Sequence, residues 1–345
     1  MDNLTHSLFA VTLANAGIRL AGRGATAALL VASNVPDIEV LTAFTGGRTA
    51  YLAAHRGPTH GPLALALALA VAGGVWLAQR IRGRRDGAAS GPALLAASVV
   101  GVVGHVAMDL ATSYGTRVLS PFSQAWYGVD LLPIADIYLW VILAVLLAAG
   151  AARPEWRQRL AVAALALTAG NYALHLGAKQ AALREAVTIQ AHAVPGSSPS
   201  PHVAFRYLGP GEPAELPAAI PTLQSPFRWR LITRTPGGFE VRETDLLASG
   251  SGSGRAPIEF PDDRGAAVER ASQAPVARTF LAFSRFPSAE AMRHSNGDVT
   301  VHWYDMRFAQ RVVAPADGRA HTSPFGAWVR LSPSGSIVGQ GLGPG

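Results

Sequence analysis

Long runs of apolar residues alternate with short polar segments over the first half of the chain. The runs that reach the length of a membrane-spanning helix are 62–78, 92–110, 131–149 and 160–176. About 20 apolar residues are needed to cross the hydrocarbon core as a helix, so we predict four full spans.

Two shorter apolar segments precede these spans, at residues 4–18 and 25–32. The first is slightly short for a full crossing, and the second stops at the sequence Ser-Asn-Val-Pro-Asp, where the proline disfavours helix in the residue before it. We therefore predict one or two short N-terminal helices that tilt or enter the bilayer only in part.

After about residue 180 the pattern changes to short segments rich in Val, Phe, Trp and Tyr, separated by Pro, Gly and Ser, which indicates strands. The predicted strands are 203–208, 227–234, 239–243, 279–283, 299–308 and 328–331. Residues 195–201 and 249–256 are predicted to be flexible connections. The fold class is thus an α-helical membrane bundle, residues 1–180, followed by a small β-rich extramembrane domain, residues 181–345.

Composition supports the membrane class, because 49% of the residues are hydrophobic and only 15% are charged. The net charge of +7 comes from arginines that cluster in short loops. By the positive-inside rule the loops 80–86 and 153–159 are cytoplasmic, which leaves 33–61, 111–130 and the C-terminal domain non-cytoplasmic. We therefore attribute the positive charge to cytoplasmic loops of a membrane protein and expect no nucleic-acid partner.

The chain contains no cysteine, so any metal site must use histidine and carboxylate. His55 and His60 flank the sequence Arg-Gly-Pro-Thr just before the first long span, and His105 and Asp109 stand one turn apart on a predicted helix. Each feature alone also has a structural interpretation, such as a packed histidine or a capping threonine.

The predicted topology gathers these side chains at the non-cytoplasmic end of the bundle. The candidate ligands are His6, Asp37, His55, His60, His105 and Asp109. Imidazole nitrogens and carboxylate oxygens suit zinc, manganese or iron, and the set exceeds what one tetrahedral ion needs, so a two-metal site stays open.

Several roles cannot be separated by spacing. Asp109 or Asp37 is a ligand or a general base, and Arg56 binds an anionic substrate group or faces solvent and lipid headgroups. Asp130 and Asp136 orient a histidine, or Asp136 pairs with a polar group on another helix.

The ordered motifs of the first 140 residues resemble a known family. They are Met-Asp-Asn-Leu-Thr-His-Ser at 1–7, Asn-Val-Pro-Asp at 34–37, His-Arg-Gly-Pro-Thr-His-Gly at 55–61 and Gly-His-Val-Ala-Met-Asp-Leu-Ala-Thr-Ser-Tyr-Gly-Thr at 104–116. This set is similar to the bacterial inner-membrane metal-dependent hydrolases of the LexA-binding, inner membrane-associated type. The six candidate ligands match polar positions of the family pattern, and Gly61 departs from it where serine is common.

The resemblance implies a multi-pass protein of the bacterial inner membrane that performs metal-dependent hydrolysis. We expect a divalent ion, zinc first and manganese or iron as alternatives, to activate water against a lipid or another phosphate ester. Asp109, Asp37 and Arg56 are the expected catalytic residues, and the lipid bilayer is the expected partner. The alternative is a non-catalytic membrane protein with a structural metal site and a partner-binding β domain. A transporter ranks below both, because the inner halves of the spans carry few ionisable residues.

Overall fold

The structure is a computed structural model that describes residues 1–83, 86–193, 217–248, 256–311 and 321–343. The predicted strand 203–208 and the predicted connection 195–201 lie outside these residues, as does 249–255. The chain divides into two compact units. The first comprises Met1–Leu41 and Ala54–Gly177, and the second comprises Thr42–Ala53 and Ala178–Gly345.

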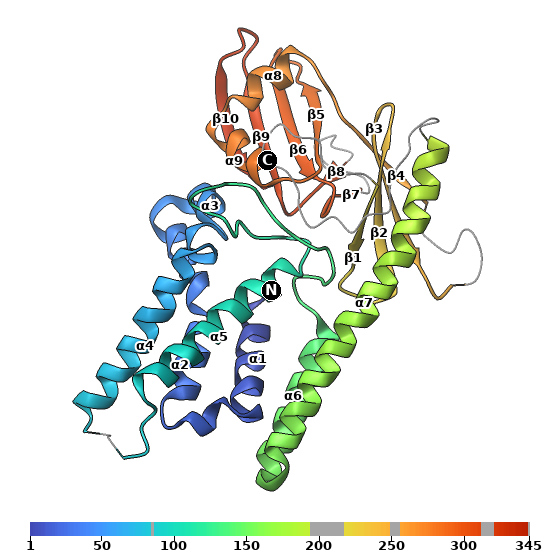
Figure 1. Ribbon diagram of the computed structural model, residues 1–345. Helices are drawn as coiled ribbons and strands as arrows, with labels where there is room; N and C mark the ends of the chain where they lie inside the picture. The colour runs from blue at the N-terminus through green and yellow to red at the C-terminus, as the bar shows by residue number, and fades with distance from the viewer. Residues whose placement is uncertain (84–85, 194–216, 249–255, 312–320, 344–345) are drawn as a thin grey trace. The chain divides into compact units, whose positions relative to one another are not determined.

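The first unit is helical (Figure 1). Its elements are α1 (Asn3–Ala16), η1 (Ile18–Ala21), α2 (Ala25–Ala32), η2 (Val35–Leu41), η3 (Pro58–His60), α4 (Leu63–Ile81), α5 (Gly91–Leu110), α6 (Ile137–Ala152), η4 (Pro154–Trp156) and the first part of α7 (Arg157–Ala193). The helix α3 (Thr42–Ala54) falls almost entirely in the second unit.

Three helical segments in the described residues are long and apolar enough to cross a membrane: Leu63–Ile81, Gly91–Leu110 and Pro154–Ala193. A fourth exists if the bent pair Ala25–Ala32 and Val35–Ala54 forms one span. The predicted spans at 62–78, 92–110 and 160–176 correspond to α4, α5 and α7.

The predicted span at 131–149 is shorter than expected, because α6 begins only at Ile137 and has 16 residues. Asp136 caps this helix: its side chain accepts hydrogen bonds from the backbone N–H groups of Tyr138 and Leu139 at 2.9 and 3.2 Å. A carboxylate cap satisfies amides that have no partner within the helix, so it fixes the helix start six residues into the apolar run.

Small residues dominate the core shared by α1, α2, α4 and α5. The buried members are Ala10, Ala14, Ala25, Ala28, Leu29, Ala72, Ala89, Leu94 and Ala97. Small side chains let helices approach closely where lipid offers no hydrophobic driving force. One close approach is at Gly101 of α5, where a Cβ atom would lie 2.7 Å from the carbonyl oxygen of Leu29 in α2.

The second unit contains two four-stranded antiparallel sheets. One has the order β1 (Ala218–Pro221), β2 (Arg228–Thr235), β3 (Gly238–Asp245), β4 (Ile258–Pro261), and the other has the order β10 (Ile337–Leu342), β9 (Gly326–Leu331), β6 (Val299–Asp305), β5 (Pro287–Arg293). The remaining elements are β7 (Gln310–Arg311), β8 (His321–Thr322), α8 (Ala266–Ser272) and α9 (Pro275–Phe283).

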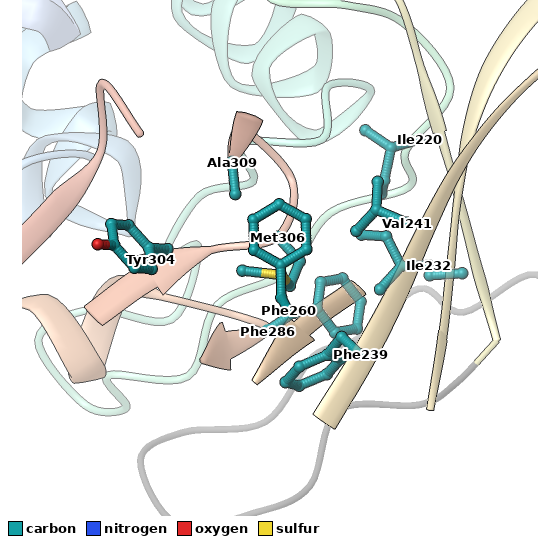
Figure 2. Packing of buried hydrophobic residues seen from close by; sticks show 10 residues of the cluster. Ile220, Ile232, Phe239, Val241, Phe260, Phe286, Tyr304, Met306 and Ala309 are labelled. Carbon is teal, nitrogen blue, oxygen red and sulfur yellow. The ribbon is translucent and has the colours of Figure 1, made fainter. Parts of the chain in front are cut away.

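Both sheets contribute to one buried apolar cluster, shown in Figure 2. Ile232, Phe239 and Val241 come from the first sheet, and Tyr304 comes from the second with Met306 just beyond it. The β-rich character predicted for the C-terminal half is therefore confirmed, and β2, β3, β6 and β9 correspond to four of the predicted strands.

The predicted strand 279–283 is wrong, because these residues form the end of helix α9. Pro275 occupies the first turn, where its missing N–H costs nothing. Val276, Ala277, Phe280 and Phe283 are buried at helical spacing. The phenylalanines thus lie on the buried face of a helix, and this packing overrides their intrinsic preference for strands.

Candidate metal centre

Four side chains from three elements of the first unit converge on one point. They are Asp37 on η2, His60 at the end of η3, and His105 and Asp109 on α5, and one ligand atom from each lies within 4.8 Å of all the others. The Nε2 atom of His60 lies 3.1 Å from Nε2 of His105 and 3.1 Å from Oδ2 of Asp109. The structure therefore brings together four of the six predicted ligands.

Five of the six separations among these atoms lie close to those of a tetrahedral site, and all six are within 4.8 Å. Metal bonds of about 2.0–2.2 Å place neighbouring ligand atoms of a tetrahedron about 3.3–3.6 Å apart. The remaining contacts are 3.4 Å from His105 Nε2 to Asp109 Oδ2, and 3.6 and 3.7 Å from Asp37 Oδ1 to Nε2 of His60 and His105. The cluster thus has the size that one metal ion requires.

Hydrogen bonds on the far side of each imidazole turn its Nε2 lone pair toward the cluster. Nδ1 of His105 lies 2.9 Å from the carbonyl oxygen of Ser33, which can only accept, so Nδ1 carries the proton. Nδ1 of His60 lies 3.1 Å from Oγ1 of Thr59 and 3.6 Å from Oε2 of Glu39. Such outer contacts are the usual means of fixing the tautomer of a metal-binding histidine.

Lone pairs from the two Nε2 atoms and from Oδ2 of Asp109 consequently face one another in a buried space. Oδ2 of Asp109 has no hydrogen-bond partner within the described part of the chain, and His60, His105 and Asp109 are at most 1% exposed. Converging lone pairs repel unless a cation lies between them. The residues therefore fit a metal ion and could hold one.

Asp109 is held from its other oxygen by positive charge. Nη2 of Arg56 lies 3.0 Å from Oδ1 of Asp109, and the amino group of Met1 also contacts this atom. Arg56 donates further hydrogen bonds from Nη1 to the carbonyl oxygen of Gly115 at 2.8 Å and to Oγ1 of Thr112 at 3.3 Å. The guanidinium, predicted to meet a substrate anion, is buried and lies against Asp109.

His6 lies beside the four-residue cluster. Its Nε2 atom is 3.5 Å from Oδ1 of Asp109, and its ring stacks on that of His105 with centroids 3.8 Å apart. Neither ring nitrogen of this buried side chain has a hydrogen-bond partner among the described residues. His6 is thus placed to contact a group bound near Asp109.

His55 does not join the cluster. Its Nδ1 atom lies 2.9 Å from Oε1 of Glu39, and its ring meets the edge of Tyr114. Burial lowers the pKa of His55 below its ordinary value, and the Glu39 carboxylate acts in the opposite direction. The structure therefore assigns His55 a contact with a carboxylate outside the candidate ligand set.

Glu39 is the residue that sequence reasoning missed. Its carboxylate accepts hydrogen bonds from Thr59 Oγ1 at 2.5 Å and from the backbone N–H of Arg56, in addition to the contact with His55. The available signal was an acidic residue within the otherwise apolar sequence Ile-Glu-Val-Leu at 38–41.

The remaining predicted positions are not members of the four-residue cluster. Asp136 caps α6 and accepts a hydrogen bond from Nδ2 of Asn171 at 2.7 Å, and Asp130 is buried in a left-handed conformation with φ of 49°. At Gly61 a side chain would collide with the carbonyl oxygen of Ser120, which accounts for glycine where the resembled pattern has serine.

Comparison with known proteins identifies a family for the helical part of the chain. The family described as YdjM inner membrane protein matches residues 1–180. No curated protein and no solved structure matches the chain. The match covers the candidate metal centre, α4, α5 and the first part of α7, and agrees with the inner-membrane character implied by the sequence motifs. The chain belongs to the YdjM inner membrane protein family.

Proposed function

We propose that this protein is a metal-dependent hydrolase of the bacterial inner membrane, acting on a lipid or another phosphate ester. The observation that carries the proposal is the convergence of Asp37 with the buried His60, His105 and Asp109 at a spacing that suits one metal ion. Two imidazoles and two carboxylates suit zinc best, with manganese and iron as alternatives. A divalent ion in such a site supplies a Lewis acid that lowers the pKa of water and polarises a phosphoryl or acyl oxygen.

Asp37 is the residue we assign to the reaction itself. Its side chain is 18% exposed, whereas those of His60, His105 and Asp109 are fully buried. The side of the cluster that Asp37 occupies is therefore the side that substrate and water reach. A carboxylate there would accept a proton from water as general base, while His60, His105 and Asp109 would hold the ion.

Arg56 supports the reaction through Asp109. Its guanidinium holds Oδ1 of Asp109 and thereby directs Oδ2 toward His60 and His105. Direct contact of Arg56 with an anionic substrate, which its guanidinium chemistry would favour, is a second role within the proposal.

The proposal is tested with protein purified in lipid nanodiscs. Metal content is measured by mass spectrometry, and hydrolysis is measured with bis(p-nitrophenyl) phosphate and with a phospholipid of the nanodisc. We expect one or more equivalents of metal, activity that a chelator abolishes and zinc restores, and loss of metal from the His60→Ala and His105→Ala variants.

The variant Asp37→Asn separates catalysis from metal binding. We expect it to retain most of the metal through the other three ligands and to lose hydrolysis. Full metal occupancy in both histidine variants would refute the metal site, and unchanged hydrolysis in Asp37→Asn would refute the assigned role of Asp37.

A structural metal site with a partner-binding β domain is the second candidate. One observation favours it, namely that the cluster offers four protein ligands, the number that a structural zinc site uses. Cobalt(II) substitution distinguishes the two, because its visible spectrum responds to exogenous ligands. A spectral change on adding phosphate indicates an open position and supports the enzyme; no change supports the structural site.

A further inference from the structure

Glu39 lies at the centre of a hydrogen-bonded network just behind the candidate metal centre. Its Oε1 atom contacts the backbone N–H of Arg56 and lies 2.9 Å from Nδ1 of His55, and its Oε2 atom accepts a hydrogen bond from Oγ1 of Thr59 at 2.5 Å. The side chain is only 5% exposed. One carboxylate thus fixes three residues of the segment that ends in the ligand His60.

Counting protons along this network assigns the tautomer of His60. A threonine hydroxyl has one proton, and a carboxylate can only accept, so Thr59 donates its proton to Glu39. Oγ1 of Thr59 then faces Nδ1 of His60, 3.1 Å away, with lone pairs only. Nδ1 must therefore be the protonated nitrogen, and Nε2 is left with a lone pair directed at His105 and Asp109.

We infer that Glu39 and Thr59 are positioning residues that act through a hydrogen-bonded relay to hold His60 in its metal-binding tautomer. The inference rests on the proposed metal site and extends it by two residues outside the ligand set. At His105 the Ser33 carbonyl oxygen accepts directly from Nδ1 and so fixes the same tautomer without a relay. Only the His60 side of the centre thus depends on a carboxylate that substitution can alter.

The substitution Glu39→Gln reverses the relay while keeping the shape of the side chain. The backbone N–H of Arg56 is a fixed donor, so the amide oxygen of the glutamine faces Arg56 and its NH₂ group faces Thr59. Thr59 must then accept from the glutamine and turn its own proton toward Nδ1 of His60. This moves the imidazole proton to Nε2, where it points into the metal position.

The test is cobalt(II) titration of the full-length protein in nanodiscs, read by visible absorption. We expect Glu39→Gln to weaken binding by about 10–100-fold, the range typical of outer-shell partners of metal ligands. Thr59→Val should also weaken binding, whereas Thr59→Ser, which keeps the hydroxyl, should bind like the wild type. The double variant should be no weaker than the worse single variant, because both changes break one chain.

The matched control is Asp136→Asn, which alters a buried carboxylate of the same unit that touches none of the four ligands. Wild-type affinity and spectrum in Glu39→Gln would overturn the inference, as would equal loss in Thr59→Ser and Thr59→Val. If the wild type itself binds no cobalt, the proposed metal site fails instead, so the two failures are distinguishable.

Discussion

Asp109 shows how one buried residue can serve two purposes. Its Oδ1 atom lies against Arg56 and the amino group of Met1, while its Oδ2 atom lies 3.1 and 3.4 Å from the Nε2 atoms of His60 and His105. A carboxylate with no exposure requires such partners, because desolvation of an unpaired charge is costly. The cationic side compensates the charge, and the other side directs a lone pair at the metal position.

The substitution Asp109→Asn is therefore expected to abolish metal binding without unfolding the protein. The amide oxygen can keep the Arg56 contact, and the NH₂ group then donates to the lone pairs of His60 and His105. We expect a loss of metal affinity greater than the about 10–100-fold of outer-shell variants. The metal-free variant should stay folded but melt at a lower temperature than the metal-free wild type, because the buried Arg56 guanidinium loses its charged partner.

Metal content by mass spectrometry and thermal unfolding of the metal-free proteins check this expectation. Stoichiometric metal in Asp109→Asn would contradict it. An unchanged melting temperature of the metal-free variant would contradict a stabilising role of the Arg56–Asp109 ion pair.

At the residue scale, the sequence predicted the four members of the candidate cluster better than the residues that contact them. His60, His105, Asp37 and Asp109 stand in polar motifs at breaks or ends of apolar helices, so their types and positions were informative. Glu39 could not be assigned, because its partners Thr59 and His55 lie about 20 residues away and only the turn at η3 brings them near. His55 could not be told from a ligand for the same reason.

The helices α2 and α5 are held together at a point that matters for the metal centre. A Cβ atom at Gly101 would lie 2.7 Å from the Leu29 carbonyl oxygen, 2.9 Å from Cβ of Ala32 and 3.0 Å from the backbone nitrogen of Ser33. The same contact places the Ser33 carbonyl oxygen next to Nδ1 of His105, one helical turn further along α5. Close helix packing and ligand orientation thus depend on one small residue.

We expect Gly101→Val to separate α2 from α5 and to disturb the Ser33–His105 hydrogen bond. Overpacking of this kind typically costs about 1–3 kcal/mol. The variant should therefore melt at a lower temperature and bind cobalt(II) more weakly, as measured by thermal unfolding and absorption titration. Gly73→Val on α4 is the matched control, because nothing lies within 4 Å of a Cβ atom there; equal effects of the two changes would exclude a specific contact.

Hydrophobic pattern predicted the elements well where they are long and failed at two boundaries. The runs that became α4 and α5 are almost uniformly apolar, so their position was determined to within a few residues. Residues 131–135 continue the apolar run ahead of the helix but are not helical, and the Asp136 cap marks where α6 begins. The five residues 279–283 are too few to distinguish the two-residue period of a strand from the 3.6-residue period of a helix.

The whole molecule joins a helical unit to a β-rich unit through α7, a single helix of 37 residues. At 1.5 Å per residue this helix is about 55 Å long, which exceeds a hydrocarbon core of about 30 Å. The arginines Arg153, Arg157 and Arg159 cluster at its start, and by the positive-inside rule this end is cytoplasmic. One crossing would then place the C-terminal unit outside the cytoplasm, on the side proposed for the metal centre. The distribution of arginines in the sequence predicts this orientation, whereas the folded structure alone does not indicate which side of the membrane each end of α7 occupies.

Single cysteines test the orientation, because the natural chain contains none and gives no background. Ser334→Cys lies on an exposed turn between β9 and β10, and Glu155→Cys lies on the exposed segment just before α7. We expect a membrane-impermeant maleimide to label Ser334→Cys in intact spheroplasts and Glu155→Cys only after permeabilisation. Among the described residues between the two sites, α7 is the only helix long and apolar enough to cross a membrane, so opposite labelling means that α7 crosses the bilayer. Labelling of both sites from outside would mean that α7 does not cross, and the reverse pattern would place the C-terminal unit in the cytoplasm.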